Sequence, residues 1–201
     1  MASRPKRKPA SLHALEPASK KRARQKFPLT TSRPELLVNG SDREFRHLVH
    51  SLLGFLSRHE QLRCGHGKAI GLAGIEYTTL ISIAHLSVDG DVNVKTVADH
   101  LHLSGAFVTS LAQRLLKLGL IHKRTDPGDR RRVTLTVSAK GHALLEQLAP
   151  MQRKVNNAEF GCINRQDLKY LIDKVDQLIE CSDRALALQA YLLAEDAGRT
   201  A

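Results

Sequence analysis

One stretch, residues 94–141, restricts the fold of this chain more than any other. It contains two segments in which apolar residues recur every three or four positions, which predicts two short helices. Asn93 and Ser104 are expected to be their N-caps, because an Asn or Ser oxygen accepts a hydrogen bond from an otherwise unpaired N–H. Gly119 is expected to end the second helix in the left-handed conformation. An alternating segment, Val133 to Val137, then predicts a strand, so the order is helix, turn, helix and two-stranded hairpin.

Each of the two helices is predicted to bury one face. The first buries Val94, Val97, Ala98 and Leu101, and the second buries Phe107 or Val108, Leu111, Leu115 and Leu118. The outer face of the second helix is small or polar and consists of Gly105, Ala106, Thr109, Ser110 and Gln113. Such a face can enter the major groove of DNA and touch base edges. The alternative is an ordinary amphipathic helix with a solvated face.

The hairpin adds a basic turn to this motif. The segment Asp126-Pro127-Gly128-Asp129 has the composition of a tight turn, and three arginines, Arg130 to Arg132, follow it. Three arginines at one turn are unfavourable unless an anionic partner receives them, and a narrow minor groove of DNA is one such partner. Asp129 is close enough in sequence to orient Arg131. The alternative is a run of solvated surface charge.

At these residues the chain resembles the MarR family of bacterial winged-helix regulators. The resemblance covers roughly residues 42–195. It is carried by Leu118-Gly119-Leu120-Ile121, a following basic pair, Asp126 to Arg131, and Val137-Ser138-Ala139-Lys140-Gly141. The last motif departs from the Leu-Thr-x-x-Gly that is usual in the family. Upstream, Gly74-Ile75-Glu76-Tyr77 is similar to the family's entry into its second helix.

The resemblance implies a mainly α fold with a small β-wing (α+β), that is, a winged helix-turn-helix with N- and C-terminal dimerisation helices. It also implies a homodimer, expected to be a repressor, that binds a palindromic operator in double-stranded DNA and responds to a small molecule or an oxidant. The residues predicted to contact DNA are Lys95, Thr96, Ser104, Gly105, Ala106, Thr109, Ser110, Gln113, Arg114, Lys123, Arg124, Asp129, Arg130, Arg131 and Arg132.

The resemblance further implies an effector, because family members often sense aromatic carboxylates or phenols between the dimerisation helices and the DNA-binding motif. Residues that would line such a cleft are Arg46, His47, His50 and Tyr77, each of which is otherwise a surface or boundary residue. Cys64 offers a redox alternative, since the nearby Arg63, His66 and Lys68 would lower a thiol pKa. Peroxide-sensing members carry their cysteine near the start of the first helix, whereas Cys64 lies near its end, so a bystander cysteine is favoured.

Charge is distributed unevenly along the chain. Residues 1–40 hold ten Lys/Arg and two Glu, residues 94–141 hold nine basic and three acidic residues, and the other segments are slightly acidic. This is the distribution expected of a nucleic-acid footprint. Residues 1–40 also contain five of the seven prolines, which predicts a disordered basic tail. That tail is either an arm that contacts phosphates without sequence preference or a solubilising segment.

The rest of the chain is expected to be helical. Residues 41–73 form an N-terminal helix that serves dimerisation and the effector cleft, capped by Ser41 with Glu44 and broken by Cys64 to Gly67. Residues 74–141 form the DNA-binding domain, with a helix from about Ile75 to Leu86. Residues 142–201 form dimerisation helices, with a kink or break at Pro150. The last of these is capped by Asn164, and its near-heptad apolar seam runs to Leu193.

Several function classes lack support in the sequence. Three cysteines without a C-x-x-C pair argue against a disulfide scaffold or zinc ribbon, and Cys162 and Cys181 are interpreted as structural. No apolar run is long enough to span a bilayer, so no membrane association and a cytoplasmic location are expected. Catalytic motifs are absent, and no metal site or cofactor is predicted. A ligand-responsive regulator is therefore favoured, and an architectural nucleic-acid-binding protein is the alternative.

Overall fold

The computed structural model describes residues 27–125, 128 and 133–199. In chain order its elements are a 3₁₀ helix Pro34–Leu36, α1 Arg43–Ala69, α2 Gly74–Leu86, α3 Val94–Leu101, α4 Gly105–Lys117, β1 Ile121–Thr125, β2 Val133–Val137, α5 Ala139–Glu159 and α6 Arg165–Arg199. The predicted mainly helical fold with a small two-stranded wing is confirmed. The chain divides into two compact units, residues 1–52 and 53–201, and each is described by itself.

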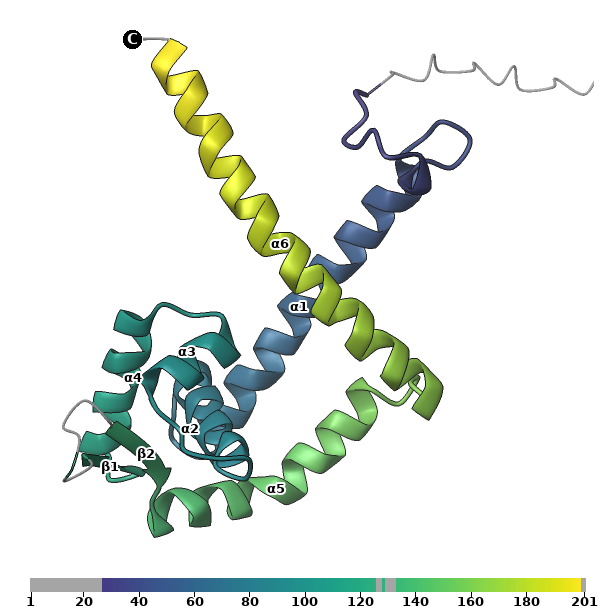
Figure 1. Cartoon of the computed structure of the whole chain (residues 1–201). Coiled ribbons are helices and arrows are strands. Elements are labelled where there is room, and N and C mark those ends of the chain that lie inside the picture. The colour runs from purple at the N-terminus through teal and green to yellow at the C-terminus, as the bar shows by residue number, and fades with distance from the viewer. Residues whose placement is uncertain (1–26, 126–127, 129–132, 200–201) are drawn as a thin grey trace, which may run out of the picture. The chain divides into compact units, whose positions relative to one another are not determined.

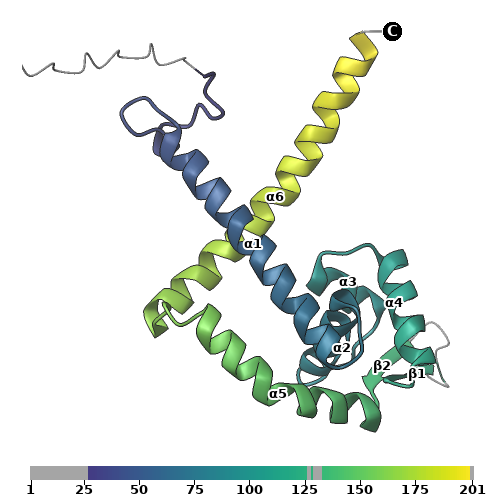
Figure 2. The ribbon, with the colours of Figure 1, turned by 180° about the vertical axis from the view of Figure 1, so that it is seen from behind.

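The core of the second unit is formed by the winged helix-turn-helix. In two opposite views, α2, α3 and α4 lie together with the β1–β2 hairpin at their edge (Figures 1 and 2). The apolar side chains that are almost fully buried there are Leu80, Ile83, Val92, Val97, Val108, Leu115, Leu120, Ile121 and Leu135. Burying one such side chain stabilises a fold by roughly 1.5–3 kcal/mol. These side chains therefore form one hydrophobic core against which the two motif helices and the wing pack.

Both predicted N-caps of the motif are present. Asn93 Oδ1 accepts from the Thr96 backbone N–H at 3.1 Å, and Thr96 Oγ1 accepts from the Asn93 N–H at 2.8 Å. Ser104 Oγ accepts from the Phe107 N–H at 3.3 Å. The turn between the helices is closed by His102, which adopts the left-handed conformation with φ of 51°.

The predicted buried stripe of α4 is resolved at one position and wrong at another. Val108 is fully buried, and Phe107 is 45% exposed, so Val108 is the core residue of the pair. Leu118 was also predicted to be buried, but it is 40% exposed. The physical reason is that α4 ends at Lys117 and Gly119, with φ of 71°, turns the chain away before Leu120 enters the core.

The wing is a two-stranded antiparallel sheet. Its register pairs Ile121 with Val137 at one end and Thr125 with Val133 at the other. Ser138 then joins the wing to α5, because its Oγ accepts from the Gly141 N–H at 3.0 Å and donates to Gly119 O at 2.7 Å. A Cβ at Gly141 would collide with the carbonyl oxygen of Leu120, so this close approach requires glycine.

Helix α1 continues through the segment that was expected to break it. Cys64 to Gly67 are helical, and α1 ends only at Ala69. The glycines serve packing between helices instead: a Cβ at Gly67 would lie 2.8 Å from Leu72 O, and one at Gly74 would lie 2.9 Å from Cys64 Sγ. Glycine at these two positions therefore allows the end of α1 and the start of α2 to approach each other.

The first unit is organised around Asp42. Its Oδ2 accepts from both the N–H and the hydroxyl of Thr30, at 2.8 and 2.7 Å, and its Oδ1 pairs with Arg46 at 2.8 Å. The hydrogen bonds from Thr30, and then the charge of Arg46, lower the pKa of Asp42. Asp42 thus holds Thr30, which lies in a segment, residues 27–40, that was predicted to belong to a disordered tail. The rest of that tail lies outside the described residues.

The predicted capping box of α1 is not formed. The Ser41 hydroxyl accepts from the Arg43 N–H at 3.3 Å. The Ser41 backbone N–H, which Glu44 was expected to bind, donates to Val38 O at 3.0 Å. The isolated bridge between Val38 and Ser41 has therefore taken the donor that the box would need.

The two C-terminal helices differ in how much they bury. α5 runs through Pro150 without the predicted break, although its ribbon changes direction along its length (Figure 1). α6 is capped as predicted, because Asn164 Oδ1 accepts from the N–H groups of Gln166 and Asp167 at 2.8 and 3.0 Å. No residue of the 35-residue helix α6 is buried. Within the described residues, no single helix is both long and apolar enough to cross a membrane.

Candidate nucleic-acid interface

The outer face of α4 is the first part of the candidate interface. Its five predicted residues are exposed, namely Gly105, Ala106, Thr109, Ser110 and Gln113, and so is the N-cap Ser104. The hydroxyls of Thr109 and Ser110 donate to the carbonyl oxygens of Gly105 and Ala106, at 2.8 and 3.2 Å. Each hydroxyl oxygen keeps acceptor capacity. The face is therefore small enough for close approach to a surface and carries groups that can form further hydrogen bonds.

Two predicted residues of α3 are already engaged in the protein. Thr96 has its hydroxyl in the reciprocal cap with Asn93, to whose carbonyl oxygen it also donates at 2.8 Å. Lys95 pairs with Asp99 at 2.6 Å, one turn along the helix, and its side chain is 82% exposed. An exposed pair of this kind contributes little to stability, so Lys95 is free to exchange Asp99 for another anion.

Arg114, also predicted to contact DNA, forms an ion pair with Glu76 of α2. The carboxylate is almost completely buried, whereas 69% of the Arg114 side chain is exposed. Sequence reasoning did not single out Glu76 for a role, but a signal was present. Glu76 is the only Asp, Glu, Lys or Arg in α2, and a lone carboxylate in an apolar helix is expected to have a partner.

The wing contributes basic side chains on its first strand. Lys123 and Arg124 of β1 are exposed, as a phosphate-contacting role requires. Four further predicted residues, Asp129, Arg130, Arg131 and Arg132, lie outside the described residues. The orientation of Arg131 by Asp129 accordingly stays a prediction.

A second polar site lies where α1, α2 and α5 meet. Tyr77 is 5% exposed, and its hydroxyl accepts from Gln152 Nε2 of α5 at 2.9 Å. The ring of His66 packs edge-on against the ring of Tyr77, with centroids 5.6 Å apart. Burial raises the pKa of the Tyr77 phenol. Gln152 and His66 were not predicted for this site, because only the fold brings Gln152 to Tyr77 across 75 positions of sequence.

His66 is the least satisfied group in this second site. It is 6% exposed, and its Nε2 is buried without a hydrogen-bond partner among the described residues. Burial, and then the neighbouring His59, lower the pKa of His66, while Glu159 acts in the opposite direction. This imidazole nitrogen is thus left without the partner that a buried polar atom normally has.

The other residues predicted for an effector site lie in a different compact unit from Tyr77. Arg46, His47 and His50 belong to the first unit and Tyr77 to the second, so their grouping stays a prediction. Arg46 is paired with Asp42, and the two histidines are exposed on α1.

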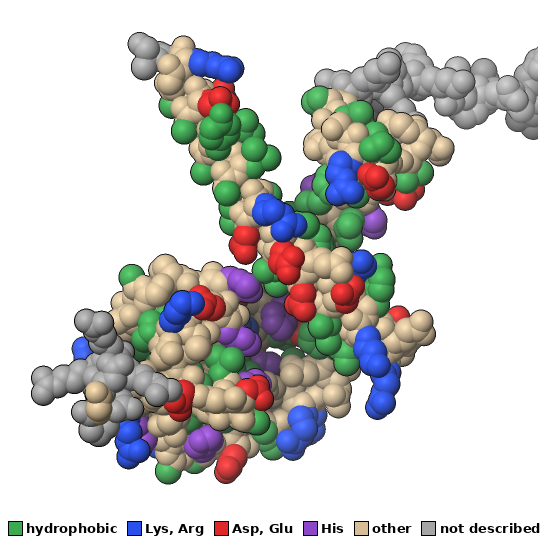
Figure 3. Space-filling model, viewed as in Figure 1, with side chains coloured by type: hydrophobic (Ala, Val, Ile, Leu, Met, Phe, Trp, Pro, Cys, Tyr) green, Lys and Arg blue, Asp and Glu red, His purple; other side chains and the backbone are tan. Residues whose placement is uncertain are grey.

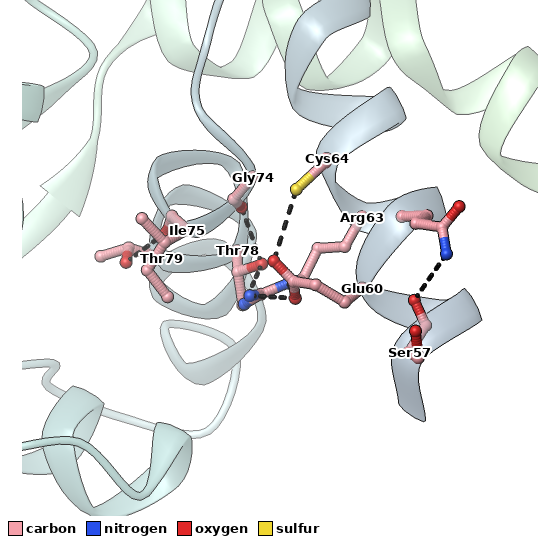
Figure 4. A network of polar contacts seen from close by, with 9 residues as sticks. Ser57, Glu60, Arg63, Cys64, Gly74, Ile75, Thr78 and Thr79 are labelled. Carbon is pink, nitrogen blue, oxygen red and sulfur yellow. Dashed lines mark hydrogen bonds and ion pairs between the residues drawn. The ribbon is translucent and has the colours of Figure 1, made fainter. Parts of the chain in front are cut away.

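Cys64 lies beside a negatively charged group, whereas a reactive thiol is expected to lie beside positive charge. Its Sγ donates to Glu60 Oε1 at 3.3 Å, and Arg63 is drawn to the same carboxylate (Figure 4). The hydrogen bond to Glu60, with burial as a second cause, raises the pKa of Cys64. Sequence reasoning counted the nearby positive charges but missed Glu60, one helical turn away. The raised pKa disfavours the thiolate and hence the redox-sensing alternative.

Comparison with known proteins agrees with this architecture. The family model described as MarR family matches residues 71–132, which extend from the turn before α2 into the wing. The HTH-type transcriptional repressor NicR of Pseudomonas putida is 24% identical over 115 residues, which are 57% of this chain and 70% of NicR.

Two solved structures share the fold. One, of BpsR from Bordetella bronchiseptica, concerns the regulation of its DNA binding by 6-hydroxynicotinic acid. It is 22% identical, covers 64% of this chain and 90% of its own, and has a TM-score of 0.53. The other is a MarR variant from E. coli complexed with operator DNA, which is 18% identical, covers 66% and 95% of the two chains, and has a TM-score of 0.56. At these identities the likeness establishes the fold alone.

Proposed function

Because the chain belongs to the MarR family of transcriptional regulators, we propose that it is a ligand-responsive, cytoplasmic repressor that binds a palindromic DNA operator as a homodimer. The family is one of DNA-binding regulators rather than of enzymes. The observation that carries the proposal is the exposed outer face of α4, which is small, uncharged and rich in hydrogen-bonding groups, beside a basic wing. A face of this kind fits the major groove and reads base edges, while the wing contacts phosphates and the minor groove.

Dimerisation is supported by the exposed apolar side chains of α6. Hydrophobic side chains are visible along its surface (Figure 3). Five residues of the heptad seam are about half exposed or more, namely Leu168, Ile172, Val175, Leu186 and Leu193. An apolar stripe of this length is typical of a helix that packs against a partner chain. We assign that partner to a second copy, which would provide the second half of a palindromic site.

For the effector we propose a small aromatic carboxylate or phenol that binds at Tyr77, His66 and Gln152. The proposal is supported by the unpartnered His66 Nε2 and the neighbouring Tyr77 hydroxyl, because a small-molecule site orients its ligand with a few placed polar groups. The compound that regulates BpsR, 6-hydroxynicotinic acid, is a hydroxylated aromatic carboxylate. It is therefore the first probe to use on this protein.

The competing function is an architectural protein that binds nucleic acid without sequence preference. Selection of duplexes from a random pool, followed by titration of the enriched duplex and of its scrambled sequence, separates the two. A regulator should bind the enriched duplex about 10³-fold or more tightly than the scrambled one. Similar affinity for both duplexes would instead support the architectural function.

The effector proposal has a thermodynamic test. If 6-hydroxynicotinic acid weakens operator binding by some factor, operator DNA must weaken binding of the compound by the same factor. We expect both effects, and we expect Tyr77→Phe with Gln152→Ala to reduce them while leaving DNA affinity in the absence of the compound nearly unchanged. Binding without any effect on the operator complex would exclude this compound as the effector.

A further inference from the structure

Three consecutive residues of α2 reach three different helices. Glu76, Tyr77 and Thr78 lie in the first turn of α2, next to the chain's entry from α1. Their partners are, in the same order, Arg114 of α4, Gln152 of α5 at 2.9 Å and Arg63 of α1 at 3.1 Å. The Arg63 contact is visible in Figure 4, where Thr78 faces the side chain of Arg63. This turn is therefore a junction between the helix whose outer face is proposed to read DNA and the two helices around the second polar site.

Glu76 is the member of this junction that most needs partners, because it is a buried carboxylate. Its Oε2 accepts from the Ala73 N–H at 2.9 Å, which caps the start of α2, and its Oε1 faces the guanidinium of Arg114. The residue is 4% exposed. A buried carboxylate is strongly unfavourable without a paired charge, so the position of Glu76 demands that Arg114 stay in place.

Arg114 is in turn fixed by its position on α4. It lies between the buried residues Leu111 and Leu115 and the exposed face that carries Thr109 and Gln113, on the flank of the helix. A guanidinium that is held there by Glu76 sets how α4 is rotated and where it lies along α2. Rotation of α4 by a small angle would move Thr109 and Gln113 away from their base edges.

We infer that Arg114 is a positioning residue, held by Glu76, that sets the sequence specificity of α4, and that it is not the DNA contact predicted from the sequence. The inference rests on the proposed DNA-binding function and adds to it a link between α4 and the helices that surround Tyr77. A shift of α1 or α5 reaches Glu76 through its neighbours Thr78 and Tyr77, and it reaches α4 through Arg114.

The test compares Arg114→Gln, Glu76→Gln and the double variant with Lys117→Gln. Lys117 is exposed in the same last turn of α4, so its variant removes an equal charge without touching the ion pair. Affinities for the selected duplex and for its scrambled sequence are measured over a series of salt concentrations. If Arg114 positions α4, Arg114→Gln lowers the ratio of the two affinities about tenfold. Its affinity then depends on the salt concentration as that of Lys117→Gln or of the wild type does. Glu76→Gln gives a similar loss, and the double variant is no worse than the more impaired single variant, because all three remove one interaction.

A direct contact between Arg114 and DNA predicts a different result. If Arg114 contacts a phosphate, Arg114→Gln weakens binding to both duplexes alike and lowers the salt slope by about one unit, while Glu76→Gln does not. That outcome would overturn the inference.

Amide hydrogen exchange of the free protein gives a readout that does not depend on DNA. We expect faster exchange in the second half of α4, residues 112–117, for Arg114→Gln but not for Lys117→Gln. Unchanged exchange would overturn the inference even if an operator is found. Faster exchange in a protein that prefers no duplex would retain the positioning role and reject the proposed function. If Glu76→Gln does not fold, Arg114→Gln still decides, since its side chain is mostly exposed.

Discussion

The winged helix-turn-helix and helix α6 place similar apolar residues in opposite environments. In the former, leucine, isoleucine and valine side chains such as Leu80, Ile83 and Val97 are fully buried within one chain. In α6, Leu168, Leu186 and Leu193 are 51–65% exposed, and no residue of the helix is buried. The first region satisfies its hydrophobic surface by itself. In the proposed dimer the second region buries its hydrophobic surface against a second copy, so its stability is expected to depend on protein concentration.

The largest effect is expected from disrupting the seam of α6. Replacing Leu186 and Leu193 by glutamate should weaken association by roughly 3–6 kcal/mol for each chain of the dimer, because each leucine loses the benefit of burial in the partner. Sedimentation at micromolar concentration should then give twice the chain mass for the wild type and the single chain mass for the variant. Val88→Glu serves as a control, since Val88 is 83% exposed outside α6. A wild-type chain that sediments as a monomer and still binds DNA would remove the contrast between the two regions.

A core substitution in the winged helix should act within one chain. Leu115→Ala removes a side chain with no exposed surface, and such a change costs about 2–5 kcal/mol of unfolding free energy. Leu118→Ala, three residues on and 40% exposed, should change it by about 0.5 kcal/mol or less. Urea unfolding followed by circular dichroism measures both. Equal losses would mean that Leu118 belongs to the core, as the sequence alone had predicted.

Loss of a helix cap should have a smaller effect. Asn93→Ala removes the acceptor for the Thr96 N–H at the start of α3, which costs about 1 kcal/mol. Asn93→Ser keeps a capping oxygen and should recover most of the loss in the same unfolding experiment. If serine is no better than alanine, the side chain of Asn93 does not act as a cap.

The smallest effect concerns pH. The lowered pKa of His66 means that the folded protein binds the proton less readily than the unfolded chain. The contribution of neutral His66 is therefore complete above its unfolded pKa, about 6.5, and is lost as the pH falls through the folded value. We expect the unfolding free energy of His66→Gln to fall less between pH 7 and pH 5 than that of the wild type. His100→Gln, at an exposed histidine of α3, serves as the control variant.

The features predicted correctly from the sequence are those with local causes. Asn93, Ser104 and Asn164 cap their helices through bonds to residues two or three positions away, and the alternation of Val133 to Val137 follows from the pleat of one strand. Each of these patterns follows from residues that are close in sequence, so the sequence alone can predict it.

The features that were missed depend on the tertiary structure. Cys64 to Gly67 were interpreted as a helix break, because glycine has a low helix propensity, but they are helical. Gly67 instead leaves room for the backbone of Leu72 and Ala73, and Gly74 leaves room for Cys64. The pairing of Tyr77 with Gln152, and that of Glu76 with Arg114, joins residues far apart in sequence. No local pattern names such a partner, so the sequence alone could not pair Arg114 with Glu76.

The measurement that tests the central claim most directly is the stoichiometry of the DNA complex. A duplex enriched by selection is mixed with the full chain, and the mass of the complex is determined by sedimentation. We predict two chains on one duplex, whose enriched sequence is an inverted repeat with half-sites about one helical turn, or 10 base pairs, apart. One chain on each duplex, or an enriched sequence without twofold symmetry, would contradict the account.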